Sequence, residues 1–408
     1  MHLLLTFIPL FLAVTLLQLS TGGVGPLDAL SGLALDFTTG QIGLLGSAHF
    51  VGFFFGSWWA PRLMGNIGHI RAFAAFTVAG TVGLLAHMLL IDAYAWAIMR
   101  VMTGLCVAGC YTVIEAWLHA RLTNNVRGRA MGGYRLVDMT GSLLAQAMIA
   151  ILEPASYVSY NILAILCCAA LLPLTLTTHQ QPDTPPSPRL RPILAFRLSP
   201  LAAVGVVAAA VSSAAFRMIG PVYGQEVGLS TDQIAWFLSA FVLGGALAQY
   251  PVGRLADRFD RRWVLTWLSL SAIAASILTA STNTMGASAV MWSALIFGAT
   301  TFPIYSVSAA HAHDFADDSQ RVELSAALMF FYAMGAMVAP WLASVLIAQR
   351  GPGAMFAMIA LVHLGLIIFG LIRMRVRPTL EERTPYLYVP RTSFLIGRLL
   401  RRHRDDNR

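Results

Sequence analysis

The stretch TDQIAWFLSAFVLGGALAQYPVGRL, residues 231–255, resembles one that lies 192 residues earlier, TGQIGLLGSAHFVGFFFGSWWAPRL at residues 39–63. Eight of the 25 positions are identical without gaps, more than composition alone should give. Each copy covers a loop, one apolar run and the following loop, so the sequence predicts two related halves. The identical pairs are Thr39/Thr231, Gln41/Gln233, Ile42/Ile234, Ser47/Ser239, Ala48/Ala240, Gly52/Gly244, Arg62/Arg254 and Leu63/Leu255.

Apolar runs fill both halves and indicate that the solvent of this chain is lipid. The sequence is 57% hydrophobic and 11% charged, whereas soluble domains carry roughly 25% charged residues. Polar breaks leave about twelve runs near the length that a spanning helix needs. We predict an all-α integral membrane protein with two six-helix, pseudo-symmetric bundles. The runs are 3–30, 41–64, 71–91, 94–118, 131–152, 157–176, 200–223, 234–252, 264–282, 285–310, 324–348 and 354–372.

A proline-rich segment near the midpoint separates the predicted bundles. Residues 181–188, QPDTPPSP, contain four prolines, and proline removes a backbone donor and breaks helices. We therefore expect a first bundle at 1–178, a cytoplasmic linker at 179–197, a second bundle at 198–373 and a basic cytoplasmic tail at 374–408.

The 27 basic residues are all arginine and give a net charge of +8. A basic protein can bind nucleic acid, but here 23 arginines gather in the tail and in the loops of one predicted face, while Arg350 alone lies on the other. Positive residues favour the cytoplasmic side of a membrane. We expect a monomer in the cell inner membrane with both termini cytoplasmic, in contact with the bilayer and not with nucleic acid.

Several motifs resemble those of the major facilitator superfamily. GRLADRFDRR at 253–262 looks like its loop signature between helices 8 and 9, while the first-half counterpart at 61–71 has Gly65 and Asn66 where Asp and Arg are usual. RVMTG at 100–104 resembles its fourth-helix motif, and EAW at 115–117 with Gly128 and Arg129 looks like the YcaD-like branch. The resemblance implies a secondary transporter and a gating role for Gly253, Arg254, Asp257, Arg258, Arg261 and Arg262.

Ionisable residues inside predicted spans are the first candidates for coupling or substrate contact, because burying charge in a bilayer is costly. Arg100 faces the interior or reaches the outer head groups; the resemblance implies a role in proton coupling or substrate contact. Glu115 is a candidate proton carrier or a gate contact of Arg129 or Arg135. Arg135 and Asp138 are three residues apart, so they share a helix face and can pair.

Other polar residues in the spans extend the candidate set. Arg217 has no acidic neighbour in sequence, so it either faces the cavity or snorkels to the head groups. Polar side chains can line a cavity or bond between helices. The further candidates are His49, Gln146 and Gln249, and His87 and Gln18 have the same character.

Two loop features have simpler interpretations. We expect Asp257 to face the positive end of a neighbouring helix. The histidines and aspartates within 311–318 match no compact metal site and are expected in a solvated loop. We predict neither a metal site nor a cofactor.

No ATP-hydrolysis motif, nucleophile elbow or metal triad is present in the sequence, so we predict a transporter and not an enzyme. The expected function is transport of a small solute by alternating access, driven by a gradient, with a proton as the coupling ion. A non-transporting membrane sensor or assembly factor on the same fold is the alternative, which the altered copy at 61–71 leaves open.

Overall fold

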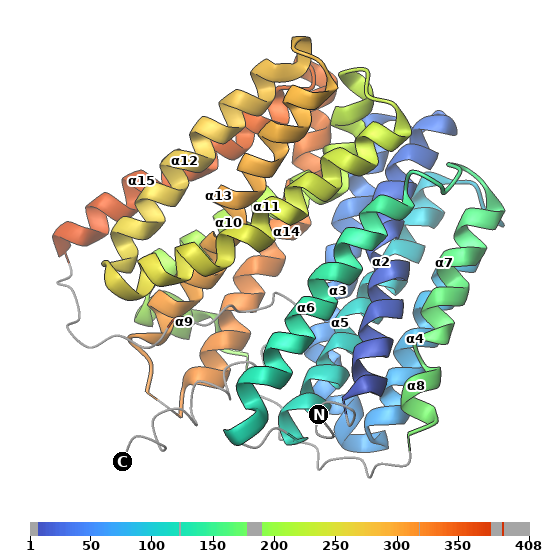
Figure 1. Cartoon of the computed structure of the whole chain (residues 1–408). Helices are drawn as coiled ribbons and strands as arrows, with labels where there is room; N and C mark the ends of the chain where they lie inside the picture. The colour runs from blue at the N-terminus through green and yellow to red at the C-terminus, as the bar shows by residue number, and fades with distance from the viewer. Residues whose placement is uncertain (1–6, 122–123, 178–189, 318, 377–385, 387–408) are drawn as a thin grey trace. The chain divides into compact units, whose positions relative to one another are not determined.

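The computed structural model describes all residues except 1–6, 122–123, 178–189, 318, 377–385 and 387–408, and leaves out the side chains of 119–129 and 283. Every regular element in these described residues is helical (Figure 1). The chain divides into two compact units, Met1–Ser187 and Pro188–Arg408. The expected linker at 179–197 spans this division, and its residues up to 189 lie outside the described part.

The first unit contains seven helices in its described residues. They are α2 (Ile8–Ala34), α3 (Thr39–Ile67), α4 (His69–Ala86), α5 (Ala93–Arg121), α6 (Asn124–Met148), α7 (Tyr157–Ala169) and the single turn α8 (Leu172–Thr175). α2 packs against α6 and α7, and α4 packs against α5 and α7. Side chains from α2, α5 and α7 and from the end of α4 form the polar cluster described below.

The second unit repeats this order after one short helix. Its described helices are α9 (Pro192–Leu198), α10 (Pro200–Glu226), α11 (Thr231–Arg258), α12 (Arg261–Ser281), the 3-10 turn η1 (Thr282–Thr284), α13 (Ala287–His313), α14 (Arg321–Arg350) and α15 (Ala354–Val376). All of α9 except Leu198 lies inside the segment that we expected to be linker. Pro192 stands in its first turn, where the missing N–H has no helical partner to lose.

Among the described residues, ten helical segments are long and apolar enough to cross a membrane, with α7 and α8 taken together as the segment Tyr157–Thr175. α3 and α6 occupy the second and fifth predicted spans but do not reach that apolarity. In α6 the sequence itself explains this, because Arg127, Arg129, Arg135 and Asp138 fall within it. The all-helical fold is as predicted, and the count of twelve spans stays a prediction.

The repeated glutamines begin equivalent helices. Gln41 accepts a hydrogen bond from the Thr38 N–H (2.8 Å) and donates its own N–H to the Thr38 hydroxyl (3.3 Å). Ser230 and Gln233 form the same reciprocal capping box at the start of α11. Thr38 and Ser230 are also 192 residues apart, so the duplication preserves a helix start.

Paired glycines allow equivalent helices to approach closely within each unit. A Cβ at Gly52 would overlap the Val101 carbonyl, and a Cβ at Gly104 would overlap the carbonyl of His49, so α3 and α5 touch through their backbones. Gly244 and Gly298 meet the carbonyls of Leu295 and Phe241 in the same way between α11 and α13. Small residues at helix crossings are common in membranes, where close packing stabilises association.

Candidate functional site

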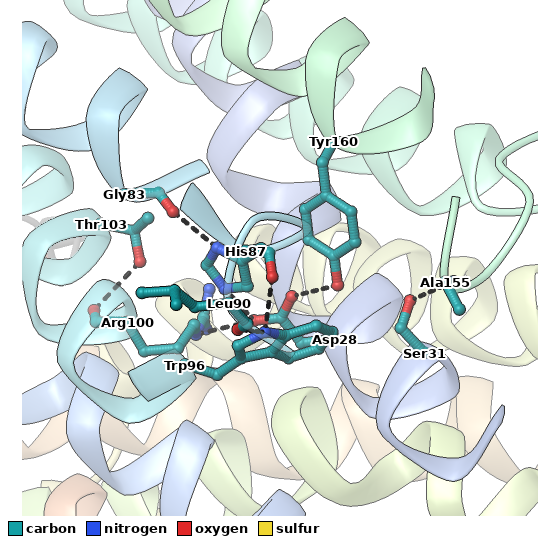
Figure 2. Close-up of polar contacts among 10 residues, drawn as sticks. All are labelled: Asp28, Ser31, Gly83, His87, Leu90, Trp96, Arg100, Thr103, Ala155 and Tyr160. Atoms are coloured by element: carbon teal, nitrogen blue, oxygen red, sulfur yellow. Dashed lines mark hydrogen bonds and ion pairs between the residues drawn. The ribbon is translucent and has the colours of Figure 1, made fainter. Parts of the chain in front are cut away.

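A buried carboxylate on α2 contacts three polar side chains of the first unit. Asp28 is 2% exposed. Its Oδ2 lies 3.3 Å from the Arg100 Nε of α5 and 3.5 Å from the Nε2 of His87 at the end of α4. The Tyr160 hydroxyl of α7 donates to Oδ1 at 2.8 Å. Figure 2 shows the Arg100, His87 and Tyr160 side chains converging on the Asp28 carboxylate.

The backbone and two aromatic rings fix the orientation of His87. Its Nδ1 lies 2.6 Å from the Gly83 carbonyl oxygen, one turn earlier in α4. The Tyr160 ring stacks on the imidazole with centroids 5.0 Å apart and an interplanar angle of 16°. Trp96 donates its indole N–H to the carbonyls of His87 and Leu90, at 2.8 and 2.9 Å. The Nε2 edge is consequently held towards Asp28 (Figure 2).

Arg100 is buried among the helices of the first unit. Its side chain is 1% exposed and paired with Asp28. A buried charge is tolerated where an opposite charge and hydrogen bonds compensate for lost water. Because a proton on Asp28 would cancel the negative partner, this cluster can couple protonation to the placement of Arg100.

Asp28 and Tyr160 are absent from the sequence-based candidate set. Asp28 is the one acidic residue in the first predicted span, 3–30, and that was the available signal. Tyr160 gave none, because a tyrosine in an apolar run is more often packing. Which helices meet around Arg100 could not be deduced from its sequence neighbours.

Glu115 lies elsewhere on α5, fifteen residues or about 22 Å from Arg100 along the helix. It is 1% exposed and accepts a hydrogen bond from the Tyr134 hydroxyl of α6 at 3.0 Å. Asp138, one turn further along α6, accepts from Gln18 and Tyr111, both at 2.8 Å. These contacts form a second polar region, and the pairing of Asp138 with Arg135 stays a prediction.

The remaining polar candidates divide between the units. His49 on α3 is 7% exposed and lies within electrostatic range of Arg100. Gln146 donates to the Gly22 carbonyl at 3.2 Å and so joins α6 to α2. In the second unit, the Arg217 guanidinium lies 5.5 Å from the Phe302 ring centre, and Gln249 accepts from the Tyr386 hydroxyl at 2.9 Å. The structure thus brings His49, but not Glu115, towards Arg100.

Arg261 is the buried centre of the α11–α12 loop. It is 1% exposed and pairs with Asp314 at 2.6 Å and with Asp257 at 3.5 Å. It also donates to the Ala310 carbonyl at 3.0 Å. The loop signature therefore joins the end of α11 and the start of α12 to the end of α13.

Asp257 and Gly253 both contact the tail residue Tyr386. Asp257 accepts the Tyr386 backbone N–H at 2.7 Å, a contact that we did not predict from the sequence. A Cβ at Gly253 would lie 2.7 Å from the Tyr386 ring, so the absent side chain makes room for it. Arg254 lies over the Tyr250 ring at 4.5 Å. Gly253 and Asp257 therefore contact a residue of the tail, and Arg254 contacts an aromatic ring of its own helix, α11.

Asp260 begins α12. Its carboxylate accepts from the Arg262 backbone N–H at 3.0 Å and from the Arg262 guanidinium at 2.7 Å. Burial raises the pKa of Asp260, but these hydrogen bonds outweigh that effect and hold the pKa below the ordinary value. Asp260 is thus the N-cap of α12.

The expectation of a solvated loop at 311–318 was wrong for its first residues. His311 and His313 lie in the last turn of α13 and are 8% and 2% exposed. His313 contacts the Ser325 hydroxyl at 3.2 Å, and Asp314 is the partner of Arg261. The helix extends beyond the predicted end because its polar residues face neighbouring helices; residue 318 lies outside the described part.

Comparisons with known proteins place this arrangement in one family. The model of the Major Facilitator Superfamily matches residues 10–226 and 201–404. The "Uncharacterized MFS-type transporter YcaD" of Salmonella heidelberg strain SL476 is 28% identical over 364 residues, covering 86% of this chain and 92% of that protein. An "Uncharacterized MFS-type transporter" of Yersinia pestis strain Pestoides F is 26% identical over 386 residues, covering 93% and 98%.

Solved structures of transporters share the fold. The nucleoside transporter NupG superposes with a TM-score of 0.71 at 14% identity, covering 91% of this chain and 98% of that one. A D-xylose-proton symporter superposes with a TM-score of 0.69 at 14% identity, covering 97% and 99%. At these identities the likeness concerns the fold alone.

Proposed function

Because the chain belongs to the major facilitator superfamily, whose members are secondary transporters and not enzymes, we propose that it couples the movement of a small solute to that of a proton. The observation that carries the proposal is the buried contact of Asp28 with Arg100 and His87. The substrate then moves by alternating access, as two halves of such a fold rock around a site near the bilayer midplane.

The proton coupling follows from the charge balance of this cluster. While Asp28 is ionised, it attracts Arg100 at 3.3 Å. Protonation of the carboxylate cancels that attraction and leaves the guanidinium as a buried cation, which a polar or anionic solute can neutralise. Proton and solute then affect the same cation, and such a shared interaction links their binding free energies.

The fold neighbours are consistent with this chemistry without naming the solute. Of the two proteins that share the fold, one is a D-xylose-proton symporter and the other is a nucleoside transporter. Glu115 remains a second candidate carrier, because it too is a buried acid on α5. The arginine distribution supports an inner-membrane protein with both termini in the cytoplasm.

A ligand screen followed by transport tests this proposal. Purified protein is screened by thermal shift against metabolites and drugs, since a ligand stabilises the state to which it binds. Transport of a hit is then followed in proteoliposomes with and without a proton gradient. We expect Asp28→Asn to abolish gradient-dependent transport of the hit. The control Asp36→Asn, at an exposed position just after the end of α2, should retain it. Gradient-driven transport that persists in Asp28→Asn would contradict the role of Asp28, and Glu115→Gln then tests the other acid.

A non-transporting sensor is the second candidate, and one observation favours it. The α3–α4 loop has Gly65 and His69 at the positions of Asp257 and Arg261, so the first unit lacks the paired charges of the second loop. A ligand that binds saturably but does not move in proteoliposomes that transport a reference solute through another carrier would favour the sensor.

A further inference from the structure

The hydrogen bond between His87 and Gly83 determines which imidazole nitrogen carries a proton. A carbonyl oxygen only accepts, so the Nδ1 at 2.6 Å from the Gly83 oxygen is the donor. In neutral His87 the other nitrogen, Nε2, therefore presents a lone pair. That lone pair faces Oδ2 of Asp28 at 3.5 Å.

Two facing acceptors leave a place for one proton. Within the described part of the chain, neither Asp28 Oδ2 nor His87 Nε2 makes a hydrogen bond, although both are buried. An unsatisfied buried polar atom costs about 1–3 kcal/mol. A proton between Nε2 and Oδ2 would satisfy both atoms at once.

We propose that His87 Nε2 and Asp28 Oδ2 share one exchangeable proton, so that His87 is the residue through which the coupling proton reaches Asp28. This inference rests on the proposed function and assigns its proton path. A proton from water binds Nε2 and gives an imidazolium beside the aspartate; its transfer to Oδ2 returns a neutral imidazole that accepts from the carboxyl O–H. The net charge of Asp28, His87 and Arg100 together rises from zero to +1 when the proton enters.

The other groups around the pair explain why the proton can leave again. Arg100 on α5 competes for the same Oδ2 and favours the ionised aspartate. The Tyr160 hydroxyl on α7 donates to Oδ1 in either state of Oδ2. His49 on α3 lies in the field of Arg100. Two of these groups can take the proton, Asp28 and His87. The other ionisable groups around them are the His49 imidazole, the Arg100 guanidinium, which stays positively charged, and the Tyr160 hydroxyl, which donates a hydrogen bond.

Nitrogen NMR of histidine measures the proposed state directly and needs no substrate. The full chain, labelled with ¹⁵N in histidine, is titrated in lipid nanodiscs, and the signals lost in His87→Asn assign His87. The asparagine amide can still donate to the Gly83 carbonyl, which limits structural loss. We expect Nδ1 to stay protonated throughout while Nε2 gains a proton as pH falls, and this titration to shift in Asp28→Asn. A His87 that protonates at Nδ1 only, or that titrates identically without the Asp28 charge, would overturn the proposal.

Transport of the screened solute separates this inference from the proposed function. We expect His87→Asn to lose stimulation by a proton gradient while retaining saturable solute binding. His363→Asn is the matched control, because His363 is also a buried histidine, bonded to the Ser212 hydroxyl at 2.8 Å in the other unit. If His87→Asn remains fully coupled while Asp28→Asn is uncoupled, His87 is not on the proton path and the proposed function survives. If wild-type protein shows no coupling, the proposed function fails, whatever the NMR result.

Discussion

The two units bury their charged residues in different places. In the first unit, Asp28 and Arg100 meet among the helices. The repeat of 192 residues relates Asp28 to Gly220, and the equivalent glycines Gly104 and Gly298, 194 residues apart, relate Arg100 to Ala294. The interior of the second unit instead contains stacked aromatic rings: Phe216 lies 4.1 Å from Phe241, 4.8 Å from Phe237 and 5.3 Å from Phe297, measured between ring centroids.

The loops show the opposite distribution. In the second unit, buried Arg261 pairs with buried Asp314 and with the half-exposed Asp257. The same two offsets relate these residues to Gly65, His69 and Ala120 in the first unit. The duplicated fold has thus kept its helix starts and glycine crossings, while one copy carries a buried Asp–Arg pair among its helices and the other carries ion pairs at its loop.

Removal of Arg100 is expected to have the largest effect on stability. Arg100→Met leaves Asp28 as a buried charge without this partner, at a cost of about 3–5 kcal/mol. The thermal unfolding temperature of purified protein measures the loss. Adding Asp28→Asn to Arg100→Met should restore much of it, because the unpaired charge is removed. A double variant no more stable than Arg100→Met would contradict the ion-pair account.

Loss of the ion pair in the second loop is expected to cost somewhat less, because Arg261 keeps Asp257 as a second acidic partner at 3.5 Å. Asp314→Asn removes the partner that lies 2.6 Å from Arg261, and we expect a loss of about 3 kcal/mol. Asp317→Asn, in the turn that follows, is the control. Equal unfolding temperatures for the two variants would show that the Arg261–Asp314 contact does not stabilise the loop.

The stability contributed by the aromatic interior of the second unit should depend on side-chain volume and not on pH. Phe216→Leu removes a ring that packs on three others and should destabilise by about 2 kcal/mol through the cavity it leaves. We expect the loss to be the same at neutral and mildly acidic pH. A loss that changes with pH would break the contrast between the two interiors.

The smallest predicted effect concerns Asp260 and depends on pH. Asp260→Ala removes the cap of α12, at about 1 kcal/mol. Because the folded-state pKa lies below the ordinary value of 3.8, the stabilisation is complete above that value and disappears as pH falls through the folded-state pKa. Thermal unfolding of wild type and variant should therefore converge in acid. A difference that persists there would mean that the ionised carboxylate is not the source.

The sequence predicted the helical membrane fold, the duplication and the Asp257–Arg262 loop, because hydropathy, identity at a fixed spacing and a loop signature are all local patterns. Helix contacts are not local. Asp28 and Arg100 lie 72 residues apart, and when both faces of a span are apolar, periodicity does not indicate which face turns inward. The partners of Arg100, the pairing of Arg261 with Asp314 and the contact of Tyr386 with Gly253 required the structure.

Proton release on ligand binding tests the central claim most directly. The screened ligand is added to purified protein in weak buffer with a pH-indicator dye, and the protons taken up or released per bound ligand are counted for wild type, Asp28→Asn and Asp36→Asn. We expect a pH-dependent proton change in wild type and Asp36→Asn, and none in Asp28→Asn at saturating ligand. The same proton change in all three proteins, or saturable binding to wild type without any proton change at any pH tested, would contradict proton coupling through Asp28.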